Sequence, residues 1–279
     1  MKAKLNERNT GKLTQPSSAL DLICAGIEPG SGIWELPGGR YSGSFRILDT
    51  GYSCLDDRDR EELLRCWCSA LAVLEPGTEA QITSLKRKLT RKDLEKGLLM
   101  DRKGDWLDRL REEYDRMLLS ALKKGSGGFR ENILTLTVRA GSTDEAASSI
   151  SRLSAAFSDA LSGIGSGLLP LGTEERLSAC AGLICPEEAY AESDYSGFDP
   201  RACAVPDYAR IGRKGIEADG RFIRVLYIRD YPAALSDGFF SRISGDGFCD
   251  MASVSIVLVN TAEAVKDARK RLLGIDTGI

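Results

Sequence analysis

The residue types available for catalysis are limited, because the 279-residue chain contains no histidine. Without an imidazole, Ser–His and Cys–His nucleophile pairs cannot form, and no histidine can act as a general base. An enzyme built from this chain would depend on carboxylates, lysine or a bound metal ion. Neighbouring carboxylates such as Glu61-Glu62 and Glu112-Glu113 fall on predicted exposed helix faces, which is typical of solvated surface charge.

Eight cysteines could in principle supply a metal site. A zinc site would need four thiolates, because no imidazole is present. Cys66 and Cys68 are two residues apart on a predicted helix and so point in different directions, and Cys180 and Cys185 lack the spacing of paired zinc ligands. We therefore predict no metal site, and reduced thiols that pack as small apolar groups. The eight positions are Cys24, Cys54, Cys66, Cys68, Cys180, Cys185, Cys203 and Cys249.

A phosphate-binding loop of the form GxxxxGK[ST] is absent from the sequence. Gly11-Lys12 is followed by Leu13 rather than Ser or Thr, and no predicted strand precedes it. The Ser- and Gly-rich stretches at 125–128 and 163–167 lack lysine and are typical of helix ends. We predict no catalytic, cofactor-binding or metal-binding residue in this chain, and no enzyme activity of the chain alone.

Basic residues are locally frequent between Lys86 and Arg130, although acidic residues are interspersed among them. The simplest interpretation is a solvated helical hairpin. Contact with an acidic protein, a phospholipid surface or DNA is the alternative. The candidate partner surface consists of Lys92, Lys96, Arg102, Lys103, Arg109, Lys123 and Lys124.

The overall composition is that of a globular protein, with 42% hydrophobic and 28% charged residues. The net charge of −3 argues against a surface dedicated to polyanions. No apolar run approaches the length that spans a bilayer, and residues 1–15 lack the apolar core of a secretory signal. These features predict a cytoplasmic location.

The hydrophobic periodicity predicts an α+β fold that positions these residues. Its first domain, residues 30–172, follows a flexible segment at 1–29 and carries a helical insert at 91–124. The order of its elements is that of a ferredoxin-like split βαβ unit. The predicted strands are 33–36, 41–49, 79–87, 131–139 and 167–171, and the predicted helices outside the insert are 57–74 and 143–162.

The second half of the chain begins like the first. After an acidic linker at 173–206, Gly220-Arg221-Phe222 precedes Asp230 by ten residues, as Gly39-Arg40-Tyr41 precedes Asp49. We expect residues 207–279 to form a second, incomplete α+β unit, truncated from something longer. Its predicted elements are a helix at 233–244, a strand at 252–259 and a helix at 261–273.

Several short motifs, in a common order over about residues 28–279, resemble the amino-terminal, non-motor region of conjugative-transfer ATPases of type IV secretion systems, from mobile genetic elements. The motifs are Gly39-Arg40-Tyr41, Phe45-Arg46, Asp49, Lys103-Gly104-Asp105-Trp106-Leu107-Asp108, Arg111-Glu112-Glu113-Tyr114, Met117-Leu118-Leu119, Glu174-Glu175-Arg176-Leu177, Gly220-Arg221-Phe222-Ile223-Arg224-Val225-Leu226 and Arg271-Leu272-Leu273-Gly274-Ile275-Asp276-Thr277.

The resemblance implies a docking and assembly domain of a cytoplasmic motor at the inner face of the cell membrane. Its partners would be other secretion-channel components and neighbouring ATPase subunits, with DNA contact as a further option. The domain that binds ATP and magnesium would lie beyond this chain. None of the family's catalytic residues matches a position here, and the 178–206 stretch departs most from the family pattern.

Two other functions fit the same predicted fold. A nucleic-acid-binding module would need aromatic residues on the exposed face of a sheet, and Tyr41, Phe45, Phe222 and Tyr227 are the candidates. A small-molecule enzyme would need a deep pocket with convergent carboxylates or arginines of shifted pKa.

Overall fold

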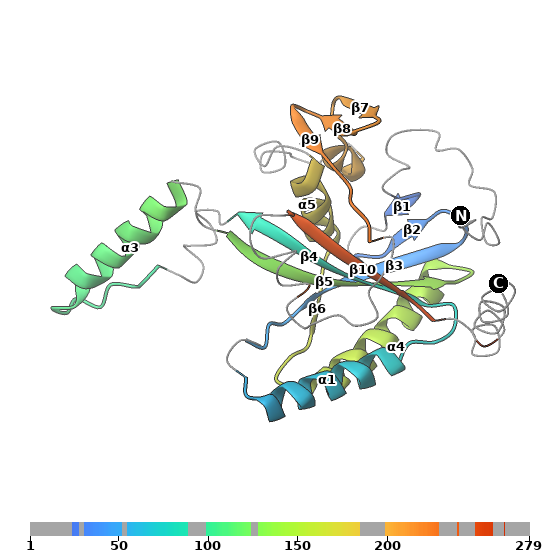
Figure 1. Cartoon of the computed structure of the whole chain (residues 1–279), viewed down its shortest axis with the longest axis horizontal. Helices are drawn as coiled ribbons and strands as arrows, with labels where there is room; N and C mark the ends of the chain where they lie inside the picture. The colour runs from blue at the N-terminus through green and yellow to red at the C-terminus, as the bar shows by residue number, and fades with distance from the viewer. Residues whose placement is uncertain are drawn as a thin grey trace, which may run out of the picture. The chain divides into compact units, whose positions relative to one another are not determined.

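The computed structural model describes residues 24–27, 31–51, 55–88, 99–123, 128–184, 199–228, 239, 249–258 and 265. This part of the chain forms an α+β fold with a seven-stranded sheet, a three-stranded sheet and four α-helices (Figure 1). The predicted helices at 233–244 and 261–273 lie outside the described residues, apart from Phe239 and Val265, which are helical.

The large sheet has the strand order β1-β2-β3-β5-β4-β10, and β6 also pairs with β3. β2 and β6 share β3, because β2 pairs with its first residues and β6 with its last three. The pairs β1–β2, β2–β3, β3–β5 and β3–β6 are antiparallel. The bounds are β1 Gly26–Ile27, β2 Trp34–Leu36, β3 Arg40–Ile47, β4 Glu79–Lys88, β5 Gly128–Arg139, β6 Leu168–Pro170 and β10 Met251–Val257.

The turn between β2 and β3 follows from its sequence. Gly38 and Gly39 have φ values of +84° and +68°, which favour glycine, and with Pro37 they connect Leu36 to its partner Arg40. The strands predicted at 33–36 and 41–49 therefore form a hairpin.

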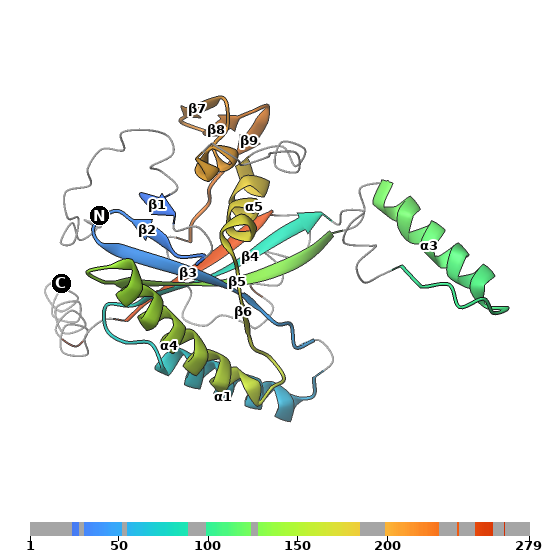
Figure 2. The same cartoon turned by 180° about the vertical axis from the view of Figure 1, so that it is seen from behind.

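Helices α1 (Asp57–Ala72) and α4 (Thr143–Ser162) cover one face of the large sheet, as Figures 1 and 2 both show. Side-chain caps begin both helices: Asp56 accepts from the backbone N–H of Asp59, and Ser142 from that of Glu145. These two predicted helices and the strand around 131–139 are confirmed to within a few residues.

The main core lies between these helices and the sheet. Phe157 of α4 is fully buried and meets Trp67 of α1 edge-to-face, with ring centroids 5.9 Å apart. Gly43 of β3 allows α4 to approach closely, because a Cβ there would lie 2.8 Å from Cγ2 of Ile150. The other large buried side chains of this core include Tyr41, Phe45, Leu134, Leu136, Leu153 and Leu161.

Helix α5 (Thr173–Ile184) packs on the opposite face of the sheet, and this corrects the sequence prediction. Residues 173–206 were predicted to be an acidic linker, but Leu177 and Ala181 of α5 are buried in a second core with Cys24 and Trp34. The predicted flexible segment 1–29 is likewise wrong at 24–27, where Cys24 is buried and β1 pairs with β2. Residues 185–198 of the predicted linker lie outside the described residues.

The described strands of the second half belong to two different sheets, whereas a single α+β unit was expected over 207–279. Strand β10 joins the large sheet beside β4, because its alternating pattern gives it one half-buried face. The other three described strands of this half pair with one another in a smaller antiparallel sheet. It consists of β7 Ala209–Gly212, β8 Gly215–Ala218 and β9 Arg221–Ile223, and it follows the 3-10 helix η3 Pro200–Ala204.

The chain divides into two compact units. Unit 1 comprises Met1–Thr83, Asn132–Ala234 and Ser253–Ile279, and unit 2 comprises Ser84–Glu131 and Leu235–Ala252. Unit 2 contains helix α3 (Asp108–Lys123) and most of the predicted insert, of which 91–98 and 124 lie outside the described residues. No helix in the described ranges has the length and hydrophobicity needed to cross a bilayer.

Candidate interaction surface on helix α3

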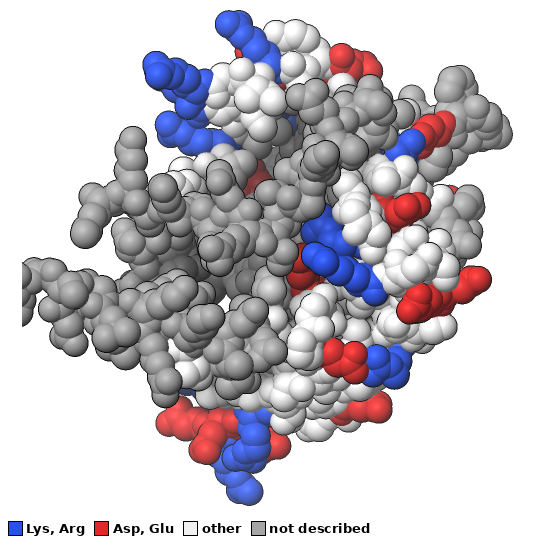
Figure 3. Space-filling model, turned by 90° about the vertical axis from the view of Figure 1, so that its right-hand side faces the viewer, with Lys and Arg blue, Asp and Glu red and all other residues white. Residues whose placement is uncertain are grey.

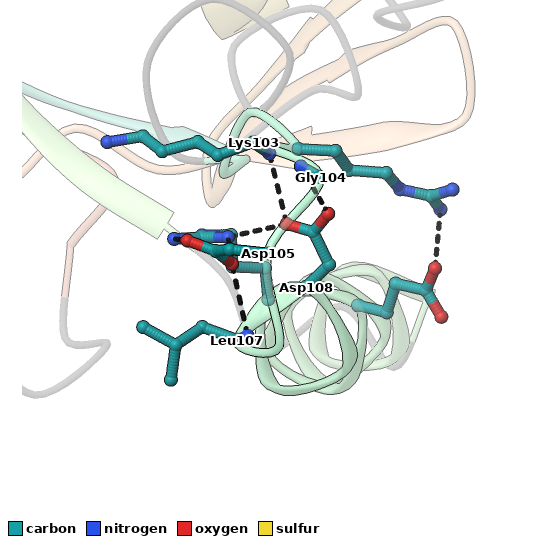
Figure 4. Close-up of polar contacts among 8 residues, drawn as sticks. Lys103, Gly104, Asp105, Leu107 and Asp108 are labelled. Atoms are coloured by element: carbon teal, nitrogen blue, oxygen red, sulfur yellow. Dashed lines mark hydrogen bonds and ion pairs between the residues drawn. The ribbon is translucent and has the colours of Figure 1, made fainter.

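The start of α3 is held by a compact turn of five residues (Figure 4). The carboxylate of Asp108 accepts hydrogen bonds from the backbone N–H groups of Lys103 at 3.0 Å and Gly104 at 2.8 Å. Asp105 accepts from the backbone N–H of Leu107 at 3.0 Å, and Gly104 has a φ of +73° that favours glycine. The motif Lys103–Asp108 therefore serves as the N-terminal cap of the helix.

Arg111 completes this cap, since its guanidinium forms ion pairs with both Asp105 and Asp108. The hydrogen bond from Arg111 lowers the pKa of Asp105, and the backbone N–H of Lys103 is the main cause of the lowered pKa of Asp108. The hydrogen bonds to Asp105 and Asp108 raise the pKa of Arg111, and that to Asp105 has the larger effect. All three groups stay charged at neutral pH, and the guanidinium pairs with both carboxylates, so the cluster stabilises the helix start.

One face of α3 is occupied by the residues that precede it. The backbone N–H of Met100 donates to Asp115 at 3.1 Å, and Arg102 forms an ion pair with Glu112 at 3.2 Å. Asp108, Glu112 and Asp115 follow each other at spacings of four and three, so they share this face. It is the polar face of the helix.

The other face carries an open row of apolar side chains. Leu107, Leu110, Tyr114, Met117 and Ala121 follow each other at spacings of three, four, three and four, which places them on one side of a helix. Leu110 is 57% exposed, Met117 is 59% exposed, and the adjacent Trp106 is 83% exposed. We call Leu107, Leu110, Tyr114, Met117 and Ala121 the apolar row.

No side chain described in α3 is buried, whereas α4 buries five: Ala146, Ile150, Leu153, Phe157 and Leu161. Both helices are amphipathic, but of their described side chains only those on the apolar face of α4 are buried. Amphipathic helices in proteins derive most of their stability from packing that face. Helix α3 therefore carries an apolar face on which no described side chain is buried.

The basic residues predicted as a partner surface do not form one patch among the described residues. Arg102 is paired with Glu112, Lys103 contributes its backbone to the cap, and Arg109 is exposed on α3. Lys123 is the last residue of α3, its side chain is not described, and Lys92, Lys96 and Lys124 lie outside the described residues. Residues 99–123 contain six acidic and six basic residues, so this stretch has no net charge. Its 3-4 apolar spacing was the sequence signal for the apolar row, and the basic partner surface stays a prediction.

The aromatic residues of the nucleic-acid alternative are divided between two places. Tyr41 and Phe45 are buried in the main core beneath α4, so they are not available to a ligand. Phe222 on β9 and Tyr227 after it are 64% and 82% exposed. Lys and Arg side chains also gather at the upper left of Figure 3, whereas acidic and basic side chains are interspersed over the rest of the described surface in that view.

A second polar cluster, around Arg176 of α5, is enclosed by the fold. Its Nη1 donates to the carbonyls of Gly32 at 2.7 Å and Ser42 at 2.8 Å, and its Nη2 donates to Oγ of Ser42 at 2.9 Å. The guanidinium carbon lies 4.1 Å from the ring centroid of Trp34. Burial lowers the pKa of Arg176 to about 10 and raises that of the nearby Cys24 thiol to about 11. These contacts join α5 to the sheet, which is a structural role.

No group of three or more Cys, Asp or Glu side chains within the described ranges is arranged to hold a metal ion. No protein-family model matches the chain, and no curated protein matches its sequence. A functional proposal for this chain therefore depends on its own residues and contacts.

Proposed function

We propose that this chain is a docking and assembly domain, and that helix α3 is its docking element. The observation that carries the proposal is the apolar row, in which Leu110 and Met117 are more than half exposed and the other three side chains are only partly buried, on a helix whose polar face contacts Met100 and Arg102. Removing apolar surface from water is worth about 25 cal/mol per Å². A partner that covers the apolar row gains this energy, and its binding would stabilise α3 in turn.

We also propose that the first domain is ferredoxin-like. The strand order β6-β3-β5-β4 supports this, because it is the order of a split βαβ unit whose four strands run in the sequence β3, β4, β5, β6. The two crossover helices, α1 and α4, cover the same face, as such a unit requires. Unit 2 then contains the insertion between the second and third of these strands.

The parent protein is, on this proposal, a conjugative-transfer ATPase of a type IV secretion system. Its partners are channel components and neighbouring subunits at the inner face of the membrane, and its ATP and magnesium sites lie outside this chain. The ordered motifs support the proposal. Four of them have a definite structural role here: Lys103–Asp108 caps α3, Gly39 turns the chain into β3, Arg176 anchors α5, and Gly220, with a φ of +79°, precedes β9.

The reading frame downstream of Ile279 tests the identity of the parent. We expect it to continue into a strand, a GxxxxGK[ST] loop and a helix, and ATP hydrolysis to be measurable with the longer protein and absent with residues 1–279 alone. A reading frame that ends at Ile279 would refute the motor proposal.

Conjugation efficiency of the parent element tests the docking role of α3. Leu110→Glu places a charge on the apolar row, and we expect DNA transfer from donor cells to fall at least tenfold. Leu64→Glu is the matched control, since Leu64 is 62% exposed on α1 and the chemical change is the same. Equal transfer by the two variants, at equal protein levels, would contradict the proposal.

A second candidate function, binding of single-stranded nucleic acid, is favoured by one observation. The small sheet and the residues after it expose Tyr208, Phe222 and Tyr227 beside Arg210, Arg213, Lys214, Arg221 and Arg224. Aromatic faces stack on bases and guanidinium groups pair with phosphates. Binding of fluorescent oligo-dT that weakens steeply with salt, and that Phe222→Ala and Tyr227→Ala reduce, would support it; salt-independent or absent binding would exclude it.

A further inference from the structure

The apolar row has the spacing of a helix that pairs with another helix. Alternating steps of three and four residues, continued over Leu107, Leu110, Tyr114, Met117 and Ala121, form the seam of two heptads. Of the described residues before α3, Met100 and Arg102 contact its polar side, through Asp115 and Glu112, and they do not pair with the seam. The surface therefore fits one further helix laid along α3.

We propose that this helix is α3 of a second copy of the chain, in antiparallel orientation. The inference rests on the proposed function of α3 as an interaction surface and names its partner. The charge along the helix is the reason for choosing a second copy. Residues 105–115 contain five acidic and two basic residues, whereas residues 116–123 contain two basic residues and no acidic one. An antiparallel pair places the acidic half of each helix against the basic half of the other, whereas a parallel pair places halves of the same charge against each other.

The register follows from full overlap of the two helices. With the two-fold axis midway along Asp108–Lys123, Leu110 faces Ala121 of the second copy and Tyr114 faces Met117 of the second copy. The two-fold symmetry repeats each of these contacts, as in an isologous dimer.

The charged residues beside the seam agree with this register. Glu113 and Arg116 lie on the same flank of the apolar row, and neither forms an ion pair with another described residue. In the antiparallel pair Glu113 of each copy comes close to Arg116 of the other, so the ion pair forms twice. In a parallel heptad pair Glu113 would instead meet Leu118.

A lipid surface fits α3 less well. Interfacial helices carry a predominantly basic polar face, whereas residues 99–123 have equal numbers of acidic and basic residues. Binding to anionic vesicles is therefore an outcome that would count against the dimer.

Sedimentation equilibrium of the intact chain over a range of concentrations tests the proposal. We expect a monomer–dimer equilibrium whose Kd rises at least tenfold in Leu110→Glu and in Met117→Glu, and is unchanged in the matched control Leu64→Glu. Circular dichroism establishes that each variant is folded. A dimer that both seam variants leave intact would overturn the proposal.

Charge reversal tests the orientation. Glu113→Arg and Arg116→Glu should each weaken the dimer roughly 2- to 30-fold, because two exposed ion pairs at ~0.2–1 kcal/mol each are lost. The double variant Glu113→Arg/Arg116→Glu restores both pairs and should return the Kd to within about twofold of the original value. Additive weakening in the double variant would refute the antiparallel register.

A photo-crosslinking benzophenone at position 110 gives the register directly. We expect cross-links to the peptide that contains Ala121 of the second copy; cross-links confined to position 110 would indicate a parallel pair and overturn the proposal.

A chain that remains monomeric at all concentrations would also overturn the proposal of an antiparallel dimer. If Leu110→Glu still impairs DNA transfer in that case, the docking function stands and the partner of α3 is another molecule. Vesicle co-sedimentation by the monomer, lost in Leu110→Glu, would identify that partner as a membrane.

Discussion

Replacement of Arg176 by methionine is expected to destabilise the fold, and two opposing effects decide by how much. In the folded chain Arg176 is only 6% exposed, and its guanidinium donates hydrogen bonds only to neutral oxygens of Gly32 and Ser42. Burial lowers its pKa to about 10, and a depression of this size corresponds to a cost of roughly 3 kcal/mol for keeping the charge. Methionine removes this cost.

The same substitution leaves three buried oxygens without their donor. Each buried acceptor that loses its partner costs roughly 1–3 kcal/mol, so the three together cost roughly 3–9 kcal/mol. The stacking of the guanidinium on Trp34 is lost as well. The balance predicts that Arg176→Met lowers the free energy of unfolding by about 3 kcal/mol.

Urea unfolding followed by tryptophan fluorescence and circular dichroism measures this change. Arg176→Lys is expected to be at least as unstable, because one ammonium cannot reproduce the planar fork that reaches both carbonyls. Arg152→Met is the control: Arg152 is exposed and pairs with exposed Glu75, so the unfolding curve should not change. If Arg176→Met were as stable as the original chain, the cost of the buried charge would outweigh the lost hydrogen bonds and the reasoning would be wrong.

Three further predictions follow from other contacts. Gly43→Ala should lower the free energy of unfolding by about 1–3 kcal/mol, because the new Cβ meets Cγ2 of Ile150 at 2.8 Å; thermal unfolding measures the change. In the folded chain iodoacetamide should modify the exposed Cys68 and leave Cys24 unmodified, because Cys24 is buried and its pKa is raised to about 11; peptide mass spectrometry reads this out. Asp108→Ala should increase amide exchange at the start of α3 without affecting the large sheet, because two backbone N–H groups lose their acceptor. Since the pKa of Asp108 is lowered on folding, its contribution is complete above its ordinary pKa of 3.8 and is lost as the pH falls through the lower folded value.

Each of these predictions has an internal control. Gly182→Ala, in α5 with no atom within 4 Å of the added Cβ, should stabilise the chain slightly, so a loss there equal to that of Gly43→Ala would contradict the packing explanation. Equal labelling of Cys24 and Cys68 would contradict the burial of Cys24. Exchange in α3 that is the same in Asp108→Ala and the original chain would contradict the role of the cap.

The helices and strands with local signals were predictable. Helix α4 was placed at its observed bounds because Ser142 can cap it and its apolar residues keep helical spacing up to Gly163. The hairpin before β3 was predictable because two glycines follow Pro37. In both places the residues that determine the structure are adjacent in the sequence.

The errors occurred where distant residues decide the structure. Residues 173–206, which include Thr173–Ile184, were assigned to a linker because the acidic residues from Glu187 to Asp199, with Ser, Gly and Pro among them, suggested a solvated stretch. Burial of an arginine within it was also unexpected, because arginine is seldom buried. Only the carbonyls of Gly32 and Ser42, more than 130 residues earlier, make burial of Arg176 favourable. The exposure of the apolar row could not be predicted either, because its periodicity is the same as that of a helix packed on a core.

The position of β10 has a consequence for how the protein is made. Gln81 beside β10 hydrogen-bonds Ser253, 172 residues later in the chain, so the large sheet remains incomplete until almost the whole chain has left the ribosome. Until then β4 is an open edge strand, which can pair with another nascent chain and aggregate. Pairing at such long sequence separation also slows folding. Shortened versions that end before Met251 should therefore express as aggregates, because they leave β4 without its neighbour in the sheet.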